Sequence, residues 1–234
     1  MTGTIAELAL AGLVLLATHY GIASTGLRGQ LVAMLGEGPY RGLYSLIALA
    51  ALVWLVIAYN QVRPGPVIWS FHPVGHFLLV VLMPLALVLV IGGLSQPNPM
   101  SAGMEERLRD PDPAVGVLRV TRHPVLWGIG LWAIGHIAAN GDLASIVFFA
   151  TLAILALFGT VLQDHRARRD RGGEFAAYEL STSAVPLLAI AQGRQNLGDA
   201  ASEFGWVRLA VVAVAYGLLL HFHLWLFGMP AYPG

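Results

Sequence analysis

Residues 74–94 read VGHFLLVVLMPLALVLVIGGL and contain no Asp, Glu, Lys or Arg. As an α-helix this stretch would be about 31 Å long, which is enough to cross the hydrocarbon core of a bilayer. Comparable uncharged stretches occur along the whole chain, without the alternation of polar and apolar residues that marks the strands of membrane barrels. The sequence therefore predicts an all-α, polytopic membrane bundle of six helices with short cytoplasmic loop segments, in one domain over residues 1–234. The expected helices cover residues 5–27, 42–62, 74–94, 124–140, 143–163 and 207–228.

The composition supports a membrane protein and excludes several other classes. Hydrophobic residues make up 57% of the chain and charged residues only 11%, and the mean hydropathy is +0.71, so a water-soluble fold could not cover its surface with charge. Thirteen basic residues balance thirteen acidic ones, which argues against a nucleic-acid partner because binding to phosphates requires a cationic surplus. The chain has no cysteine and no lysine, which excludes disulfides, thiolate ligands and Schiff-base chemistry.

The arginines are distributed unevenly between the two sides of the predicted bundle. With six spans, every arginine except Arg63 falls on one side. Because cytoplasmic loops carry an excess of basic residues, we expect a bacterial inner-membrane protein with both termini on the outer, periplasmic side. The first span lacks the basic segment and the cleavage site of a signal peptide, so we interpret it as a span. The cytoplasmic loops, residues 96–122 and 164–207, are long enough to form a cap, and the apolar residues 184–192 are expected at the interface.

Two of the eight histidines are predicted to lie inside the bilayer. His19 precedes Arg28 by about 13 Å of helix, and His136 follows His123 by about 20 Å along the fourth span. Neutral imidazoles on two different transmembrane helices are the ligands that an axially ligated haem b requires, and Trp132 would supply an aromatic wall beside the porphyrin. The alternative is that each histidine is a hydrogen-bond partner for a neighbouring helix, the commoner role of a single intramembrane histidine.

The other histidines offer weaker metal sites. His72 and His76 have the i, i+4 spacing of ligands on one helix face, but a proline between them marks a helix start and no HExxH motif is present. His221 and His223 would point to nearly opposite sides of a helix, which favours interface packing for that pair. His123 and His76 remain alternatives to one of the two proposed haem ligands.

The densest polar motif is Arg122-His123-Pro124, which leads directly into the fourth predicted span. Proline in the first turn, with basic side chains before it, places donors at a helix N-terminus, an arrangement favourable for an anion. We expect Arg28, Arg41 and Arg122 to form an anion site beside His123, for a haem propionate or for a phosphate or carboxylate of another cofactor. The alternative is that these arginines only determine the topology.

Several motifs together resemble the NnrU family of integral membrane proteins. They are HYGIASTGLR at residues 19–28, Gly36-Glu37 with Tyr40-Arg41, TRHP at residues 121–124 followed by Gly128, Trp132 and His136, NGD at residues 140–142, Asp164 with Arg166, and HLWLFG at residues 223–228. The family includes bacterial proteins encoded with denitrification genes and the plastid 15-cis-zeta-carotene isomerase. The resemblance implies a haem b protein with His19 and His136 as ligands. In the isomerase a cysteine implicated in ligand switching lies three residues before the second histidine, where this chain has Ala133, so thiolate switching is not implied here.

A weaker resemblance, over about residues 95–190, is to the isoprenylcysteine methyltransferase superfamily, in which an Arg-His-Pro segment helps to hold S-adenosylmethionine. This chain has Asp164-His165-Arg166 where paired glutamates usually follow the next helix. Three functions therefore remain open. The first is a haem-dependent protein that acts on a membrane lipid or a hydrophobic small molecule, either as an isomerase or in a redox role linked to denitrification. The others are a membrane methyltransferase and a non-catalytic accessory protein of a nitrogen-oxide reductase.

Overall fold

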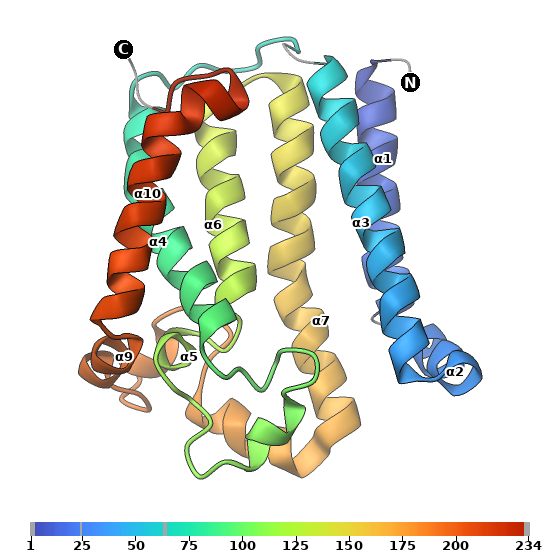
Figure 1. Ribbon diagram of the computed structural model, residues 1–234, viewed down its shortest axis with the longest axis vertical. Coiled ribbons are helices and arrows are strands. Elements are labelled where there is room, and N and C mark those ends of the chain that lie inside the picture. The colour runs from blue at the N-terminus through green and yellow to red at the C-terminus, as the bar shows by residue number, and fades with distance from the viewer. Residues whose placement is uncertain (1–2, 24, 63–64, 232–234) are drawn as a thin grey trace.

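The computed structural model describes residues 3–23, 25–62 and 65–231, and the regular elements within these ranges are helices (Figure 1). The long helices are α1 (Ile5–Ala17), α3 (Glu37–Val62), α4 (Val74–Ser95), α6 (Pro124–Ala139), α7 (Leu143–Ser181) and α10 (Trp206–Phe227). The shorter elements are the π-helix η1 (Thr18–Ala23), α2 (Gly26–Leu35), the 3-10 helix η2 (Glu105–Arg109), α5 (Val117–Val120), α8 (Leu188–Ala191) and α9 (Leu197–Phe204). The predicted all-α membrane bundle is thus confirmed.

The structure supports fewer membrane crossings by helix length than the six that the sequence predicts. Five helices of the described chain are long and apolar enough to cross a bilayer. The remaining expected span, which corresponds to α6, has only 16 residues, about 24 Å of helix. It begins at Pro124, whose fixed φ suits a first turn, and it stops at the turn that starts with Asn140. The count of six therefore remains a prediction that depends on this short apolar helix.

Two expected helices end at different residues. α1 does not continue to residue 27: the π-helix that contains His19 follows it, and then Thr25 starts α2 by accepting a hydrogen bond from the backbone N–H of Leu27, as N-caps do. α7 continues from the expected residue 163 to Ser181, because helix-forming arginines and alanines follow the apolar run. Its membrane-spanning part is the uncharged stretch that ends at Gln163.

Contacts link the helices in the order α10, α4, α6, α7, α1 and α3. Figure 1 shows α6 and α7 in the middle of the bundle. Small residues allow the closest approaches, as is usual between helices in membranes. A β-carbon at Gly128 of α6 would lie 2.8 Å from the Ala86 carbonyl oxygen of α4, and one at Gly12 of α1 would lie 2.6 Å from the Thr151 hydroxyl oxygen of α7. The peripheral helix α10 buries only Val212 among its residues, as expected for a helix that faces lipid on most sides.

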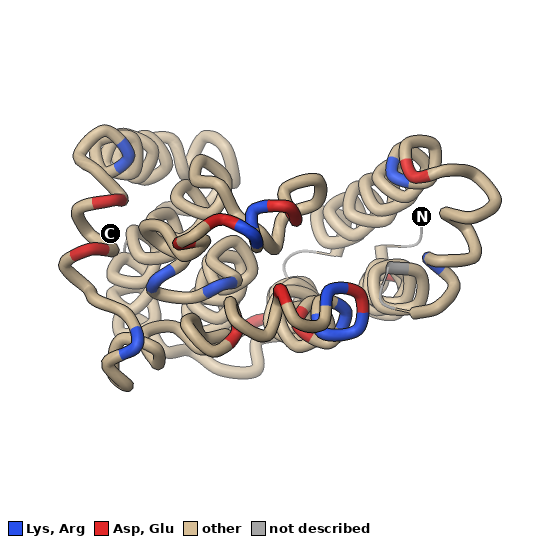
Figure 2. The backbone as a smooth tube through the Cα atoms, turned by 90° about the horizontal axis from the view of Figure 1, so that it is seen from below, with Lys and Arg blue, Asp and Glu red and all other residues tan. Residues whose placement is uncertain are grey.

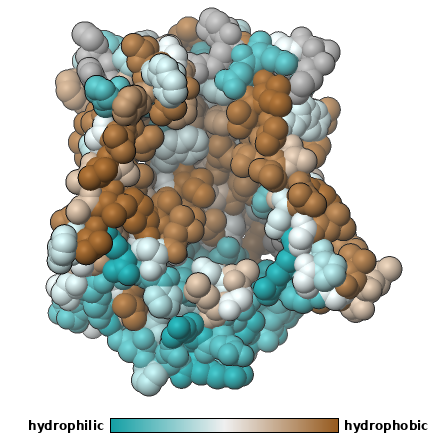
Figure 3. Space-filling view, in the orientation of Figure 1, coloured by the Kyte–Doolittle hydropathy of each residue, from teal (hydrophilic) through white to brown (hydrophobic). Residues whose placement is uncertain are grey.

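The polar residues gather at one end of the bundle, which we call the charged end. The view from below in Figure 2 shows acidic and basic residues on the loops and short helices there, and Figure 3 shows the same end as a hydrophilic band beneath apolar helices. α1 begins and α10 ends at the opposite end (Figure 1). Arg63, the single arginine expected on that side, lies outside the described residues.

Candidate functional site

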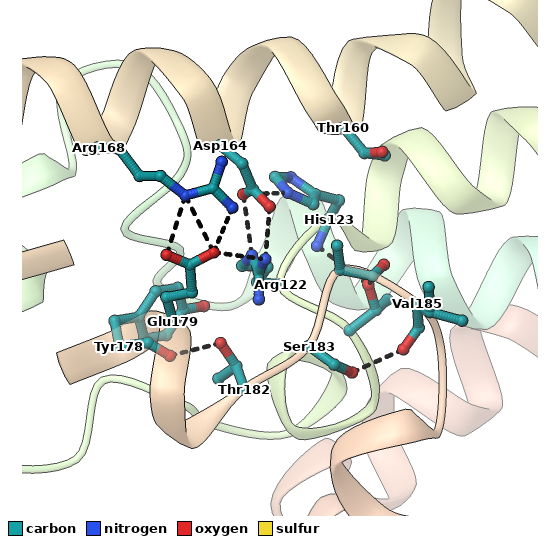
Figure 4. A network of polar contacts seen from close by, with 12 residues as sticks. Arg122, His123, Thr160, Asp164, Arg168, Tyr178, Glu179, Thr182, Ser183 and Val185 are labelled. Atoms are coloured by element: carbon teal, nitrogen blue, oxygen red, sulfur yellow. Dashed lines mark hydrogen bonds and ion pairs between the residues drawn. The ribbon is translucent and has the colours of Figure 1, made fainter. Parts of the chain in front are cut away.

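Asp164 is the centre of a buried ionic network at the charged end (Figure 4). Arg122 donates from Nε to Asp164 Oδ1 at 2.9 Å and from Nη2 to Oδ2, and His123 donates from Nε2 to Oδ1 at 2.8 Å. The side chains of Arg122, His123 and Asp164 are 6%, 0% and 5% exposed. Glu179 lies 3.5 Å from Arg122 Nη2 and accepts a hydrogen bond from Arg168 Nε at 3.0 Å. We call these five residues the Asp164 network.

Two local features of the chain assemble this network. His123 is the N-cap of α6, and Pro124 begins the helix, so Arg122 and His123 leave the helix end side by side and face α7. Further along the chain, Gly172 bends α7 with a φ of 34°, a conformation that favours glycine. The bend brings Phe175 over Arg122, with the guanidinium carbon 5.9 Å from the ring centre. The Arg122 charge is therefore enclosed by carboxylates and an aromatic face.

Two atoms near this network have unused hydrogen-bonding capacity. Because a carboxylate only accepts, His123 carries its hydrogen on Nε2. Its Nδ1 is buried and has no hydrogen-bond partner among the described residues, and the same is true of the Tyr178 hydroxyl. Arg122, in contrast, already donates to Asp164 and faces Glu179, so it does not present a free guanidinium to an open anion site.

His19 and His136 occupy similar chemical environments on different helices. His19 Nδ1 lies 2.9 Å from the carbonyl oxygen of Leu15, and His136 Nδ1 lies 2.7 Å from that of Trp132. A carbonyl oxygen can only accept, so each Nδ1 must carry the hydrogen. In the neutral ring this leaves the lone pair on Nε2, the tautomer that a metal-ligating histidine with a fixed Nδ1–H adopts.

Contacts with α7 indicate the depths of the two imidazoles in the bundle. Tyr20, the neighbour of His19, donates to the carbonyl oxygen of Ile154 on α7, whereas the His136 ring stacks on Phe149. These contacts are five residues apart on α7, about 7 Å along its axis. Each ring lies over the preceding turn of its own helix. Because α1 and α6 run in opposite directions, the two rings are displaced toward each other along the bundle axis. Their separation along that axis is therefore smaller than the separation of their Cα atoms.

Trp132 lies beside His136, as the sequence predicts for an aromatic wall. The two ring centres are 5.0 Å apart, and Trp132 also makes an edge contact with Phe149 at 5.1 Å. Its backbone carbonyl is the acceptor that fixes the His136 tautomer. Trp132 therefore orients His136 through its backbone and borders it with its side chain.

Arg28 and Arg41 do not join Arg122. Both donate to the same oxygen of Glu37, at 2.8 Å from Arg28 Nη2 and at 2.9 Å from Arg41 Nε. They line a cavity of about 410 Å³ at the charged end, and Arg122 is not among its lining residues. The expected three-arginine cluster is thus divided between this cavity and the Asp164 network, because Asp164 and Glu179 hold Arg122.

The remaining histidines do not form a larger site. His72 precedes α4 instead of sharing a helix face with His76, although the two rings are 5.1 Å apart. His76 Nδ1 is buried without a hydrogen-bond partner among the described residues, and His223 Nδ1 donates to the carbonyl oxygen of Met229. Within the described ranges no three His, Asp or Glu side chains gather as possible metal ligands, so the histidines can offer a metal only pairs.

A second polar network fixes the loops at the charged end. Arg119 donates from Nε to Glu203 Oε2 at 2.8 Å and from Nη2 to Asp112 Oδ2 at 2.7 Å. The hydrogen bond from Arg119 is the main reason that the pKa of Glu203 lies below its usual value, and the same bond raises the pKa of Arg119. This network ties α9 to α5 and to the loop before it.

The sequence did not reveal the partners of the Asp164 network. Asp164 itself carried a signal, because a carboxylate at the end of an apolar span is unfavourable without a cation beside it. No sequence feature pointed to Glu179 or Tyr178, since their position beside Arg122 depends on the bend at Gly172. The same bend makes Arg168, which the sequence assigns to a simple basic run, the second cation on Glu179.

Comparisons with known proteins identify relatives of the chain. A family model described as "NnrU protein" matches residues 7–231. The chain is 28% identical over 214 residues to the chloroplastic 15-cis-zeta-carotene isomerase of Arabidopsis thaliana, covering 89% of this chain and 57% of the relative. It is also 28% identical over 200 residues to the Zea mays protein of the same name, covering 84% of this chain and 53% of the relative. The chain thus spans little more than half the length of these relatives. No solved structure matches it significantly. These matches confirm the resemblance drawn from the motifs: the chain belongs to the NnrU family.

Proposed function

We propose that this protein is a haem b-binding membrane isomerase that acts on a hydrophobic, polyene-like small molecule within the bilayer. The observation that carries the proposal is the shared tautomer of His19 and His136, which leaves Nε2 of both rings able to bind iron. Membership of a family whose relatives are named as carotene isomerases supports the reaction class. When bound, haem would supply redox-active iron, held by His19 and His136, whose potential would depend on these ligands and their hydrogen bonds.

The residues around the histidines fit this assignment on chemical grounds. The hydrogen bonds at Nδ1 orient both rings and increase the electron density at Nε2. Trp132 and Phe149 border His136, and Tyr44 of α3 lies edge-on to His19 at 5.7 Å. Ala133 stands three residues before His136 and is completely buried. The sequence has no cysteine, so a thiolate would not be among the residues that hold the haem.

The shape of the bundle supports a substrate that arrives from the lipid. Figure 3 shows an apolar face that is hollowed between α3 and the α4–α10 pair. α3 carries exposed leucines and valines, and an apolar surface of this kind favours a hydrocarbon substrate over a polar one. We further propose that the protein lies in a bacterial inner membrane with both termini outside. A redox role linked to denitrification, beside a membrane reductase, is the alternative that the same haem site would serve.

The test combines spectra with an isomerisation assay. Purified wild type should show the Soret and α/β bands of six-coordinate, low-spin haem b, and proteoliposomes should convert a cis polyene to its trans isomer. His19→Ala and His136→Ala should each lose the low-spin spectrum and the conversion. His221→Ala, on an exposed part of α10, is the matched control and should retain both. Unchanged low-spin haem in either of the first two variants would refute the ligand assignment, and loss in His123→Ala or His76→Ala alone would transfer it.

The same samples separate the competing functions. Haem without isomerisation, but with electron transfer to a reductase, would favour the redox role. Co-purified S-adenosylmethionine in a colourless protein would favour a methyltransferase.

A further inference from the structure

The cavity at the charged end combines basic side chains from distant parts of the sequence. It has a volume of about 410 Å³ and lies among α2, α3, η2 and α7. Seven of its lining residues are charged, and the basic ones exceed the acidic ones. The basic residues are Arg28, Arg41, Arg166 and Arg171, and the acidic residues are Glu37, Glu105 and Asp170.

The carboxylates do not satisfy all of these guanidinium groups. Glu37 is shared by Arg28 and Arg41 through a single oxygen. Arg166 Nε lies 3.7 Å from Asp170 Oδ2, and Arg171 Nη2 lies 3.6 Å from Glu105 Oε1. Both separations are longer than a hydrogen bond. Among the described contacts, neither Arg166 nor Arg171 donates a hydrogen bond, although each side chain is only 33% exposed.

Arg166 and Arg28 are also close enough to repel each other. Arg166 lies beyond the apolar part of α7, and burial together with the positive charge of Arg28 lowers the pKa of its guanidinium. Two like charges that face one cavity are stabilised when an anion lies between them. Guanidinium groups bind phosphate and carboxylate through paired N–H donors, so these are the anions that the cavity suits.

The cavity is connected to His19 by a line of aromatic rings on α3. The guanidinium carbon of Arg28 lies 5.6 Å from the ring centre of Tyr40, which stacks on Tyr44 at 6.0 Å. Tyr44 in turn contacts the His19 ring at 5.7 Å. The cavity therefore lies at the membrane boundary directly inward of the proposed haem ligand, where the polar end of an amphiphile would be positioned.

We propose that this cavity is a binding site for a phosphate or carboxylate group, held mainly by Arg28 and Arg166. The group could belong to a phospholipid headgroup or to the propionates of haem. Only the second source rests on the proposed function. Arg122 takes no part, because Asp164 and Glu179 already hold it.

The first experiment asks whether the cavity binds an anion at all. Inorganic phosphate is titrated into the purified full-length protein at constant ionic strength, with calorimetry and the thermal unfolding midpoint as readouts. Arg166→Gln should weaken phosphate binding at least about tenfold, the effect expected for loss of one charge-assisted contact. Arg109→Gln is the matched control, since Arg109 pairs with Glu174 at the same end but outside the cavity, and its affinity should equal that of the wild type.

A variant that should bind phosphate more tightly distinguishes a binding effect from misfolding, because misfolding could only weaken binding. Glu37→Gln removes the carboxylate that competes for Arg28 and Arg41, so phosphate should bind several-fold more tightly. No phosphate binding by the wild type, equal losses in Arg166→Gln and Arg109→Gln, or unchanged affinity in Glu37→Gln would each overturn the proposal.

The second experiment identifies the source of the anion. In the haem arm, haem is titrated into wild type and Arg166→Gln and followed at the Soret band. Weaker haem binding, with the low-spin spectrum retained at saturation, assigns the cavity to the propionates. In the lipid arm, native mass spectrometry measures retained phospholipid, and its loss in Arg166→Gln alone assigns the cavity to a headgroup. Failure of the haem ligands themselves would appear separately, as loss of the low-spin spectrum in the histidine variants.

Discussion

Gly12 of α1 lies directly against Thr151 of α7, so closely that a β-carbon at Gly12 would be 2.6 Å from the threonine hydroxyl oxygen. Thr151 directs that hydroxyl to the Val147 carbonyl of its own helix and leaves its methyl group near α1. The contact sets the distance between the two helices about two turns outward of His19. The distance between α7 and the helix that leads into His19 therefore depends on a residue without a side chain.

Replacing Gly12 by valine should force α1 away from α7. Overpacking of this kind destabilises a protein by about 1–3 kcal/mol, so we expect a lower thermal unfolding midpoint in detergent and weaker haem retention. Gly21→Ala is the control, because nothing lies within 4 Å of a β-carbon there, and it should behave as the wild type. Equal stability of the two variants would show that the α1–α7 contact is not close in solution.

Asp164→Asn should be among the most destabilising single changes at the charged end. It leaves the 6% exposed Arg122 side chain without its principal counter-ion, and breaking a buried ion pair on one side costs about 3–5 kcal/mol. Asp110→Asn removes the partner of the exposed Arg107 and should change stability by less than about 1 kcal/mol. Denaturant unfolding of both variants compares the two pairs, and similar values would mean that water reaches Arg122.

Stability should fall in acid partly through Glu203. Its pKa is lower in the folded protein than the usual value of 4.5, chiefly because Arg119 donates to it. The stabilisation is therefore fully present above that usual value and is lost as the pH falls through the lowered pKa. Between about pH 6 and about pH 3, the unfolding midpoint of the wild type should decrease more than that of Glu203→Gln. Parallel decreases would assign the acid sensitivity to other carboxylates.

The absence of cysteine allows the predicted orientation to be tested without background labelling. Ser70→Cys lies in the loop before α4 and Ser202→Cys lies on α9, at opposite ends of the bundle, and both positions are exposed. With both termini outside, an impermeant maleimide should label Ser70→Cys in intact cells and Ser202→Cys only after permeabilisation. The reverse pattern would invert the topology.

The sequence predicts the spans well because hydropathy acts over a whole helix. Residues 74–94 match α4 to within one residue, since the apolar run gives way to Ser95-Gln96-Pro97 where the helix ends. The first helix was harder to predict: the change to a π-helix at Thr18 and the new start at Thr25 depend on local hydrogen bonds that hydropathy does not register. The residues of α6 were predicted correctly, but this helix is shorter than the 18 residues of a membrane span.

The candidate sites were predictable to different degrees. His19 and His136 can be found from sequence because a polar ring inside an apolar span is conspicuous, and their tautomers follow only from the structure. Arg122 was conspicuous as well, but its partner Asp164 is 42 residues away in the chain, so pairing could not be derived from spacing. Arg166 looked like one member of a basic run until the cavity showed that it faces Arg28.

The central position of α6 and α7 has a consequence for biosynthesis. The ribosome delivers α1, α3 and α4 to the membrane first, and of these α1 and α3 can pair at once. α4 packs against α6 and α10, which are both made later. During translation the face of α4 that packs against α6 therefore stays exposed to lipid until the α6–α7 hairpin is inserted. Completion of the α4 environment thus depends on helices encoded in the second half of the sequence.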